Sequence, residues 1–221
     1  MSVVVEGRNL HKFYRIGDDE VFALRDVSLD LGQGEIVALI GASGSGKSTL
    51  LACIAGLEEP DGGYVKVAGS RISHRTEAAR SQLRRRHVGI LMQSGTLFDH
   101  LTVFQNIRLQ QHLAGTGEDE QVHQLLEKLG LARQGDKLPI QLSGGEVARG
   151  GLAVALAGAH TVLLCDEPTA ELDSKTEAAI LSLIRERCDE GTAALVATHS
   201  EAVARMANRA IHLKDGRVVD A

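Results

Sequence analysis

The chain has 221 residues, of which 43% are hydrophobic and 24% are charged, and its formal net charge is −5. This length and apolar content allow one domain with a sizeable core, and the negative charge argues against generic nucleic-acid binding. No apolar run approaches the roughly 18 residues of a membrane span, and the first residues lack the pattern of a secretory signal. Cys53, Cys165 and Cys188 lack metal-ligand spacing, so we expect reduced, structural thiols.

The first third of the chain predicts short strands around one helix. Residues 10–14 are typical of an edge strand, and the apolar residues 36–40 indicate a buried parallel strand. Residues 48–55 predict a helix that Gly56 closes. Residues 64–67 alternate in polarity after a turn and predict a further strand.

Between the strand at 36–40 and this helix lies the run Gly-Ala-Ser-Gly-Ser-Gly-Lys-Ser, residues 41–48, which fits the phosphate-loop pattern G-x-x-x-x-G-K-[ST]. Glycines in the loop let the backbone wrap phosphates, and the helix start favours anions. Lys47 would reach the β- and γ-phosphates, and the Ser48 hydroxyl would coordinate Mg²⁺. The nucleotide-binding residues expected here are Gly41, Ser43, Gly44, Ser45, Gly46, Lys47, Ser48 and Thr49.

The middle of the chain predicts mainly helices. Arg80 and the run 84–87, Arg-Arg-Arg-His, end a predicted helix, where cations favour the helix dipole; we prefer this interpretation to a phosphate-binding patch. A strand at 88–92 precedes Gln93, and a helical insertion follows it. Within the insertion, residues 121–129 are strongly helix-like.

Residues 142–146, Leu-Ser-Gly-Gly-Glu, predict a capped helix start. Ser143 is a good N-cap, and Gly144 and Gly145 leave backbone N–H groups exposed. Together they would form a second phosphate-binding surface.

The last third predicts alternating strands and helices. The buried strand 161–165 ends at Asp166 and Glu167, at the carboxyl edge where parallel sheets bind ligands. Asp166 would hold Mg²⁺ in its outer shell, and Glu167 would polarise the water that attacks the γ-phosphate. A helix is expected from residue 175, a core strand at 194–198 and a final hairpin turn at 214–217.

The phosphate loop, the Leu-Ser-Gly-Gly-Glu segment and Asp166-Glu167, in this order, resemble the ATP-binding-cassette (ABC) ATPases over nearly the whole chain. The resemblance implies an α/β fold: a P-loop NTPase core with a mixed sheet, an N-terminal antiparallel β subdomain and an inserted helical subdomain at about 94–158. The whole chain, 1–221, would be one domain. Residues 142–146 match the family's signature motif, so Ser143, Gly144, Gly145 and Glu146 would complete the ATP site of a second copy in a head-to-tail dimer.

The same resemblance implies roles for four further residues. Gln93 would be the Q-loop glutamine, which senses Mg²⁺ and the attacking water, and His199 the switch histidine that hydrogen-bonds the γ-phosphate. Asp173, in a D-loop with Glu171, would contact the facing subunit, although helix capping explains it equally. Tyr14 would stack on adenine, with Phe13 as the competing assignment and simple strand packing as the alternative to both.

The spacing of residues 14–29 looks like that of the lipoprotein-release, macrolide-export and cell-division group of ABC ATPases. Residues 101–107 resemble the segment of that group that contacts the coupling helix of the membrane subunit. Val103, Phe104 and Ile107 could equally be core residues of an amphipathic helix.

The helix after the signature departs from the family. Val147 and Ala148 replace common glutamines, Val154 replaces an arginine, and Gly150 and Gly151 lie inside the helix. Each glycine costs about 1 kcal/mol of helix propensity relative to alanine, so we expect a less rigid helix and a weaker dimer contact.

The sequence therefore predicts an Mg²⁺-dependent ATPase with Lys47, Gln93, Glu167 and His199 as catalytic residues and Ser48, Gln93 and Asp166 at the metal. It would power export, or the handling of extracytoplasmic lipids, lipoproteins or peptides, from the cytoplasmic face of the inner membrane, bound to separate permease subunits. One alternative is a soluble ABC ATPase that acts on ribosomes or DNA, although such relatives usually carry two cassettes or coiled-coil insertions. Another is a scaffold that does not need hydrolysis.

Overall fold

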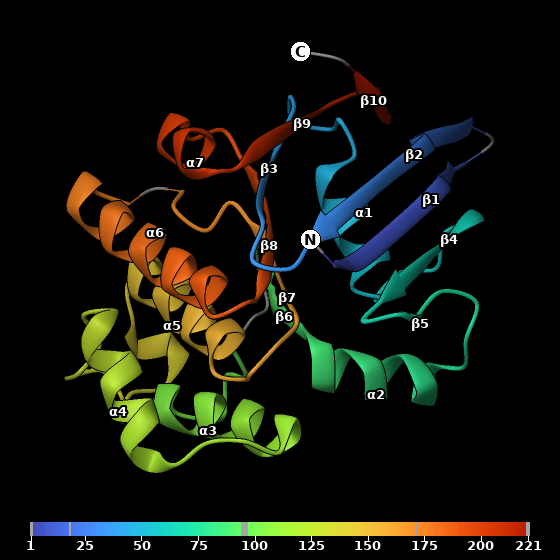
Figure 1. Ribbon diagram of the computed structural model, residues 1–221. Coiled ribbons are helices and arrows are strands. Elements are labelled where there is room, and N and C mark those ends of the chain that lie inside the picture. Colours follow the sequence, from blue (N-terminus) through green and yellow to red (C-terminus); the bar gives the residue numbers. More distant parts are fainter. Residues whose placement is uncertain (1, 18, 94–96, 171, 220–221) are drawn as a thin grey trace.

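The computed structural model describes residues 2–17, 19–93, 97–170 and 172–219, which form two β-sheets and the helices around them (Figure 1). A four-stranded antiparallel sheet has the order β2-β1-β4-β5, and a six-stranded mixed sheet has the order β10-β9-β3-β8-β7-β6. The strands are β1 (Val3–Ile16), β2 (Asp19–Gly32), β3 (Ile36–Ile40), β4 (Gly62–Val67), β5 (Ser70–Arg71), β6 (Val88–Leu91), β7 (Val162–Asp166), β8 (Ala193–Thr198), β9 (Arg209–Lys214) and β10 (Arg217–Val219).

The helices fall into two groups by the sheet face that they cover (Figure 1). One hydrophobic cluster joins α1 to residues of both sheets, and a second joins the other face of the mixed sheet to α3, α4, α5 and α6. The helices are α1 (Lys47–Ile54), α2 (Glu77–His87), α3 (Val103–Ala114), α4 (Asp119–Lys128), α5 (Gly144–Leu156), α6 (Ser174–Asp189) and α7 (Glu201–Met206), with a 3-10 turn at Pro139–Gln141.

The centre of the mixed sheet is parallel, because β3 pairs with β8 and β9, and β7 pairs with β8 and β6, all in parallel register. Every residue of β7 and β8 is buried, as the continuous apolar runs in the sequence predicted. Asp166 lies opposite Ala197, and Ile40 lies opposite Thr198. The carboxyl ends of β3, β7 and β8 therefore meet at one edge of the sheet.

The fold class that the sequence predicted is confirmed, with small shifts at element boundaries. Residues 36–40 form β3 as expected, and α4 covers most of the predicted helix at 121–129. The C-terminal hairpin turns at Asp215 and Gly216, both with positive φ. Among the described residues from 97 to 158 there are helices and turns but no strand.

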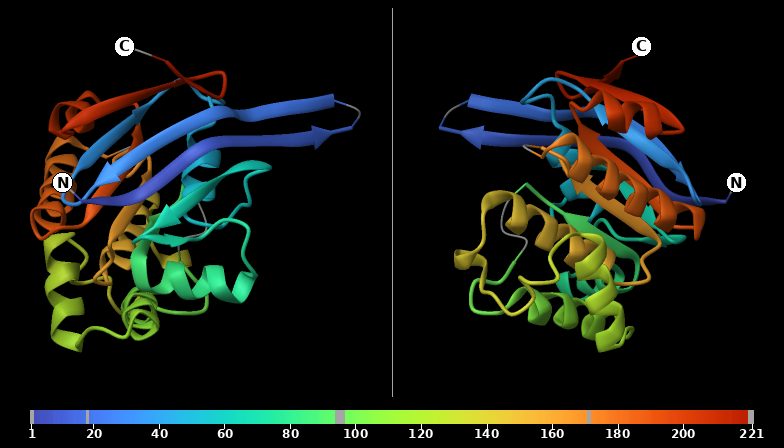
Figure 2. Two further views of the ribbon diagram at one scale, coloured as in Figure 1. Left: turned by 45° about the vertical axis from the view of Figure 1, so that its right-hand side comes forward. Right: turned by 90° about the vertical axis from the view of Figure 1, so that its left-hand side faces the viewer.

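The N-terminal hairpin extends furthest from the body of the molecule (Figure 2). Strands β1 and β2 are each 14 residues long, and β4 pairs with β1 only up to His11. Beyond that point β1 pairs with β2 alone, with Phe13 opposite Phe22 and Tyr14 opposite Val21. The edge strand predicted at residues 10–14 thus has one free edge at Tyr14.

A buried histidine joins the mixed sheet to α3. His160, before β7, is 6% exposed, and its Nε2 lies 3.2 Å from Nε2 of Gln110. Its Nδ1 has no hydrogen-bond partner among the described residues. Burial, with a smaller contribution from Arg187, lowers the pKa of His160 to about 4.

This pKa predicts that acid destabilises the fold through His160. Between about pH 6.5, where an unfolded histidine titrates, and pH 4, the unfolded chain binds a proton that the folded chain excludes, so the free energy of unfolding decreases as the pH falls. Urea unfolding of the wild type and of His160→Asn at pH 7 and pH 4.5 measures this. The variant should lose less stability over that interval than the wild type. His112→Asn, at an exposed position of α3, should keep the wild-type dependence, and equal slopes for all three proteins would contradict the prediction.

Candidate active site

The phosphate loop is shaped by its glycines and by the strands behind it. Gly44 and Gly46 have φ of 78° and 104°, in the region that favours glycine. A Cβ on Gly46 would lie 2.2 Å from the carbonyl oxygen of Ala23 in β2, and one on Gly41 would lie 2.2 Å from that of Leu213 in β9. The loop is thus packed against both sheets and has no space for side chains at these two positions.

The polar groups of the loop fit a phosphate chain. The N-cap of α1 is Gly46, and no side chain caps the helix, which leaves N–H groups of the first turn open. Ser45 Oγ is buried and has no partner among the described residues. Lys47, 7% exposed, donates to the carbonyl oxygens of Gly41 at 2.7 Å and Ala42 at 3.2 Å, so its ammonium lies over the loop. These groups would donate hydrogen bonds to phosphate oxygens.

Ser48 and Asp166 bring together two elements that are distant in the sequence. Ser48 Oγ, on the first turn of α1, donates to Asp166 Oδ2 at the end of β7 at 2.6 Å. A hydroxyl and a carboxylate are hard oxygen ligands, which Mg²⁺ prefers. No group of three acidic, histidine or cysteine residues among those described could hold a metal.

Glu167 and His199 form a second pair at the same edge. His199 Nε2 lies 3.3 Å from Glu167 Oε1, and the His199 N–H donates to Oε2 at 3.3 Å. Glu167 has φ of 52°, a left-handed conformation that is unusual for a side chain of this size, and its N–H donates to the carbonyl of Ala197 in β8 at 2.9 Å. The backbone is therefore held so that the carboxylate faces the end of β8.

A cavity of about 250 Å³ joins these groups. It brings together several residues that the sequence predicted as site residues, and Gln93 lies in its wall, while no residue of the signature segment 142–146 does. The cavity is lined by Val21, Phe22, Ala23, Ser43, Gly44, Gly46, Lys47, Ser48, Thr49, Gln93, Asp166, Glu167 and His199.

Residues 21–23 of β2 belong to this wall, and sequence reasoning did not place them there. Phe22 is 42% exposed, its ring lies 6.0 Å from that of Phe13, and the Arg25 guanidinium lies 4.9 Å from its centre. The spacing between residues 14 and 29 served only for the resemblance to one group of ABC ATPases, and the structure shows that these residues form the paired strands β1 and β2. The spacing does not reveal that β2 crosses the phosphate loop.

Tyr14 lies beside the cavity and is not part of its lining. Its hydroxyl donates to Glu58 Oε2 at 2.5 Å and lies 3.5 Å from Thr49 Oγ1, while Lys12 Nζ is 5.5 Å from the ring centre. Burial, together with the hydrogen bond to Glu58, raises the pKa of Tyr14 to about 12. Stacking of Tyr14 on adenine stays a prediction, with Phe22 as a further aromatic candidate.

The signature segment forms a capped helix start, as predicted. Ser143 is the N-cap of α5; its N–H and hydroxyl donate to Glu146 Oε2 at 2.8 and 2.9 Å, and Gln134 donates to Oε1 at 2.8 Å. The hydrogen bonds from Ser143 lower the pKa of Glu146. Ser143 and Gly144 are exposed. This surface is therefore open to solvent, and it does not line the cavity of its own chain.

Asp173 caps α6. Its Oδ1 accepts from the N–H groups of Lys175 and Thr176 at 3.0 Å, and its Oδ2 accepts from the Thr176 hydroxyl at 2.7 Å. The bonds from Thr176 lower the pKa of Asp173. Capping is thus present, contact with a second subunit stays a prediction, and Glu171 lies outside the described residues.

With this geometry, comparison with known proteins decides the family. Residues 24–170 match the family model described as ABC transporter. The chain belongs to the ABC transporter family. As an ABC ATPase it is 37% identical, over 99% of its length, to the macrolide export ATP-binding/permease protein MacB 1 of Yersinia pestis bv. Antiqua (strain Antiqua) and to MacB of Salmonella typhimurium. The chain covers only 34% of the length of these relatives.

Solved structures agree with this assignment. The dimeric post-hydrolysis structure of the ATP-binding cassette MJ0796 bound to ADP and Pi matches with a TM-score of 0.93 at 33% identity and covers 98% of this chain and 97% of that one. A structure described as the ATP binding subunit of an ABC transporter matches with a TM-score of 0.87 at 28% identity, over 97% of this chain and 88% of that one. This chain is therefore an ATP-binding and ATP-hydrolysing cassette.

Phe22 and Tyr14 are the two aromatic candidates for contact with adenine, and substitution can distinguish them. If Phe22 contacts adenine, Phe22→Ala should weaken ATP binding about fivefold, in line with the free energy of one aromatic contact, and leave inorganic triphosphate binding unchanged. Isothermal titration with both ligands measures this for Phe22→Ala, Tyr14→Ala and Phe98→Ala. Phe98, an exposed residue outside the cavity, is the control. An ATP affinity that falls only in Tyr14→Ala would assign the base to Tyr14 alone.

Proposed function

We propose that this cassette works as a Mg²⁺-ATP-driven head-to-tail homodimer on the inner face of the membrane, bound to separate permease subunits. It would power the export or extracytoplasmic handling of a lipid, lipoprotein or peptide. The observation that carries the proposal is the cavity in which Lys47, Ser48, Asp166, Glu167 and His199 meet. None of the described helices is long and apolar enough to cross a membrane.

Each residue has a step that follows from its position. Lys47 exchanges its two carbonyl acceptors for phosphate oxygens when ATP enters, and the loop N–H groups neutralise further charge. Glu167 accepts the proton of the attacking water as the bond from water oxygen to the γ-phosphorus forms and the bond to the β-γ bridging oxygen breaks. His199, paired with Glu167, orients the γ-phosphate. Mg²⁺, held through Ser48 and Asp166, would neutralise charge on the β- and γ-oxygens.

The need for a second copy follows from the signature surface. A Cβ on Gly144 would meet no described residue within 4 Å, and the φ of Gly144 is not positive, so nothing in the described part of its own subunit requires glycine there. Close approach of a phosphate from outside would require it. The solved relative MJ0796 is dimeric by its description, which supports the same arrangement here.

We place the permease contact beside α3. The sequence left Val103, Phe104 and Ile107 open between a permease contact and the core, and Phe104 is partly buried against the core cluster. Val103 and Ile107 are 0% exposed core residues and are unavailable to a partner.

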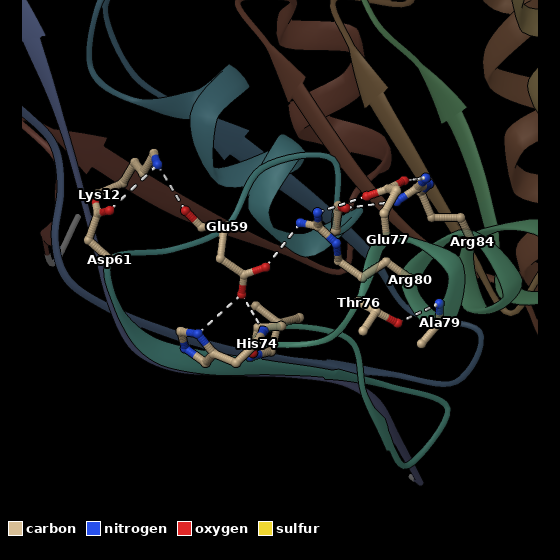
Figure 3. A network of polar contacts seen from close by, with 12 residues as sticks. Lys12, Glu59, Asp61, His74, Thr76, Glu77, Ala79, Arg80 and Arg84 are labelled. Atoms are coloured by element: carbon tan, nitrogen blue, oxygen red, sulfur yellow. Dashed lines mark hydrogen bonds and ion pairs between the residues drawn. The ribbon is translucent and has the colours of Figure 1, made fainter.

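A groove of about 240 Å³ runs between α2, β6, α3 and α5, and it is lined by Ser81, Arg84, Arg85, Val88, Ile90, Gln110, Leu113, Val154 and Ala155. Arg84 is paired with Glu77 (Figure 3) and donates to the Gly56 carbonyl, so the exposed Arg85 supplies the charge of the groove. Its charge suits a permease segment with an apolar anchor and an acidic residue. The MacB relatives, described as ATP-binding/permease proteins, support a membrane partner.

One experiment tests the dimer. Glu167→Gln should bind ATP without hydrolysing it, so light scattering after size-exclusion chromatography should show a dimer with Mg²⁺-ATP and a monomer without it. Ser143→Arg in the same background should abolish the dimer, since the long side chain fills the space of the facing phosphate. Arg133→Ser, which changes the charge at an exposed site outside α5, is the control. A monomer under all conditions would contradict the proposed homodimer.

A second experiment tests the groove. Arg85→Glu should lower the fraction of the chain recovered with membranes from its own cells about tenfold and leave the ATPase rate of the purified chain unchanged. Arg86→Glu is the matched control, because Arg86 is also exposed on α2 but does not line the groove. Recovery with nucleic acid instead of membranes would favour the soluble ABC ATPase. Intact cellular function of Glu167→Gln would favour the scaffold.

A further inference from the structure

One glutamate of α6 joins the two loops that carry Glu167 and His199. Glu177, in the first turn of α6, accepts two hydrogen bonds at a single oxygen, Oε1, from the Thr169 hydroxyl at 3.1 Å and from the Ser200 hydroxyl at 2.6 Å. Thr169 lies two residues after Glu167, and Ser200 directly follows His199. The Glu177 carboxylate therefore connects the loop after β7 to the loop after β8.

The loop after β7 is a tight turn that keeps Thr169 close to Glu167. The Ala170 N–H donates to the Glu167 carbonyl at 3.2 Å, and Thr169 is only 7% exposed. A buried hydroxyl that loses its partner costs free energy, so the bond to Glu177 constrains where Thr169 can lie. The turn that carries Glu167 is constrained with it.

The loop after β8 is held by a similar set of bonds. Ser200 is the N-cap of α7, and its hydroxyl accepts from the Ala202 N–H at 3.1 Å while it donates to Glu177. The Ser200 N–H also donates to the Thr198 hydroxyl at 2.9 Å. His199 lies between Thr198 and Ser200, so these bonds determine where its backbone lies.

The helix dipole does not explain this arrangement. An acidic residue in the first turn of a helix is favourable whichever way its side chain points. Glu201, in the first turn of α7, has a side chain that is 90% exposed and pairs with Arg205 of the same helix at 3.0 Å. Glu177, by contrast, is half-buried and accepts hydroxyl groups from two other segments of the chain.

We propose that Glu177 is a positioning residue that holds Glu167 and His199 at the separation that ATP hydrolysis needs. Their side chains lie 3.3 Å apart. If the two loops move relative to one another, the carboxylate and the imidazole no longer reach the attacking water and the γ-phosphate together. This inference rests on the proposed function, since it uses the roles proposed there for Glu167 and His199.

Steady-state hydrolysis of Mg²⁺-ATP by the purified chain tests the proposal. Glu177→Ala removes both bonds and should lower kcat about tenfold. The KM for ATP should stay within about twofold, because Glu177 does not line the cavity. Glu177→Gln keeps an oxygen that can accept both hydroxyl groups, so its kcat should stay within about threefold of the parent. An unchanged kcat in Glu177→Ala, or an equal loss in both variants, would overturn the proposal.

Thr169→Val keeps the proposal testable if Glu177→Ala does not fold. It removes one of the two bonds and changes the volume of the side chain little. It should lower kcat about threefold with an unchanged KM, and Thr169→Ser, which keeps the hydroxyl, should restore the parental rate. Equal rates for Thr169→Val and the parent would show that the bond to Glu177 does not matter.

Glu201→Ala is the matched control for charge. It removes a first-turn carboxylate two residues after His199, and the printed partner of that carboxylate is Arg205, not a group of either loop. Its kcat should stay within about twofold of the parent. If it lowers kcat as strongly as Glu177→Ala does, the charge near His199 explains the data and the proposal is wrong.

A second readout separates positioning from general damage to the chain. In a His199→Ala background the imidazole is already absent, so Glu177→Ala should lower the residual rate less than about twofold. The same tenfold loss in both backgrounds would overturn the role of Glu177. Failure of the proposed function is distinguishable, because it appears with Glu177 intact: if Glu167→Gln hydrolyses ATP at the parental rate, the role proposed for Glu167 is wrong and this inference fails with it.

Discussion

The hydrogen bond between Ser48 and Asp166, 2.6 Å long, ties the first turn of α1 to the end of β7, and the site depends on the strand order that makes it possible. Strands β3 and β7 lie on either side of β8, all three parallel. The phosphate loop after β3, the two carboxylates after β7 and His199 after β8 therefore end at one edge. The parallel pairing of these strands thus brings together residues that are more than a hundred positions apart in the sequence.

The sequence predicted the parts of the site that follow directly from buried strands. The apolar runs before Gly41, Asp166 and His199 identify three strands from local sequence alone. The glycine spacing identifies the phosphate loop that follows the first of them. Lys47, Ser48, Asp166, Glu167 and His199 lie at or just after the ends of elements that the sequence predicts, and all five line the cavity, while their assignment as site residues stays a prediction.

Features that depend on contact between distant elements could not be predicted in the same way. Phe22 lines the cavity because β2 crosses the phosphate loop, and alternating strand residues give no sign of that crossing. The sequence left Val103 and Ile107 equally open as core residues or as a contact with the membrane subunit. A helix with this spacing can present its apolar face to either. Only the packing of α3 against α5 decides between them, and it places both residues in the core.

In the proposed dimer, the cavity and the signature surface would be two halves of one site, and they do not meet within one subunit. The cavity holds the groups for phosphate, metal and water, whereas the exposed start of α5 presents backbone N–H groups and open glycines to solvent. The glycines at 150 and 151 weaken this helix by about 1 kcal/mol each relative to alanine. A Cβ on Gly150 would lie 3.1 Å from Leu97 Cδ1, and this close packing gives one of them a structural reason.

Complementation between two inactive variants tests most directly that these halves function across two subunits. Lys47→Ala lacks the phosphate loop but keeps the signature, and Ser143→Arg lacks the signature but keeps the phosphate loop. If the site forms between copies, mixing the two should restore ATP hydrolysis, because one of the two sites in the mixed dimer is intact. If the mixture stays as inactive as each variant alone while both remain folded, the site does not form in trans and the account is wrong.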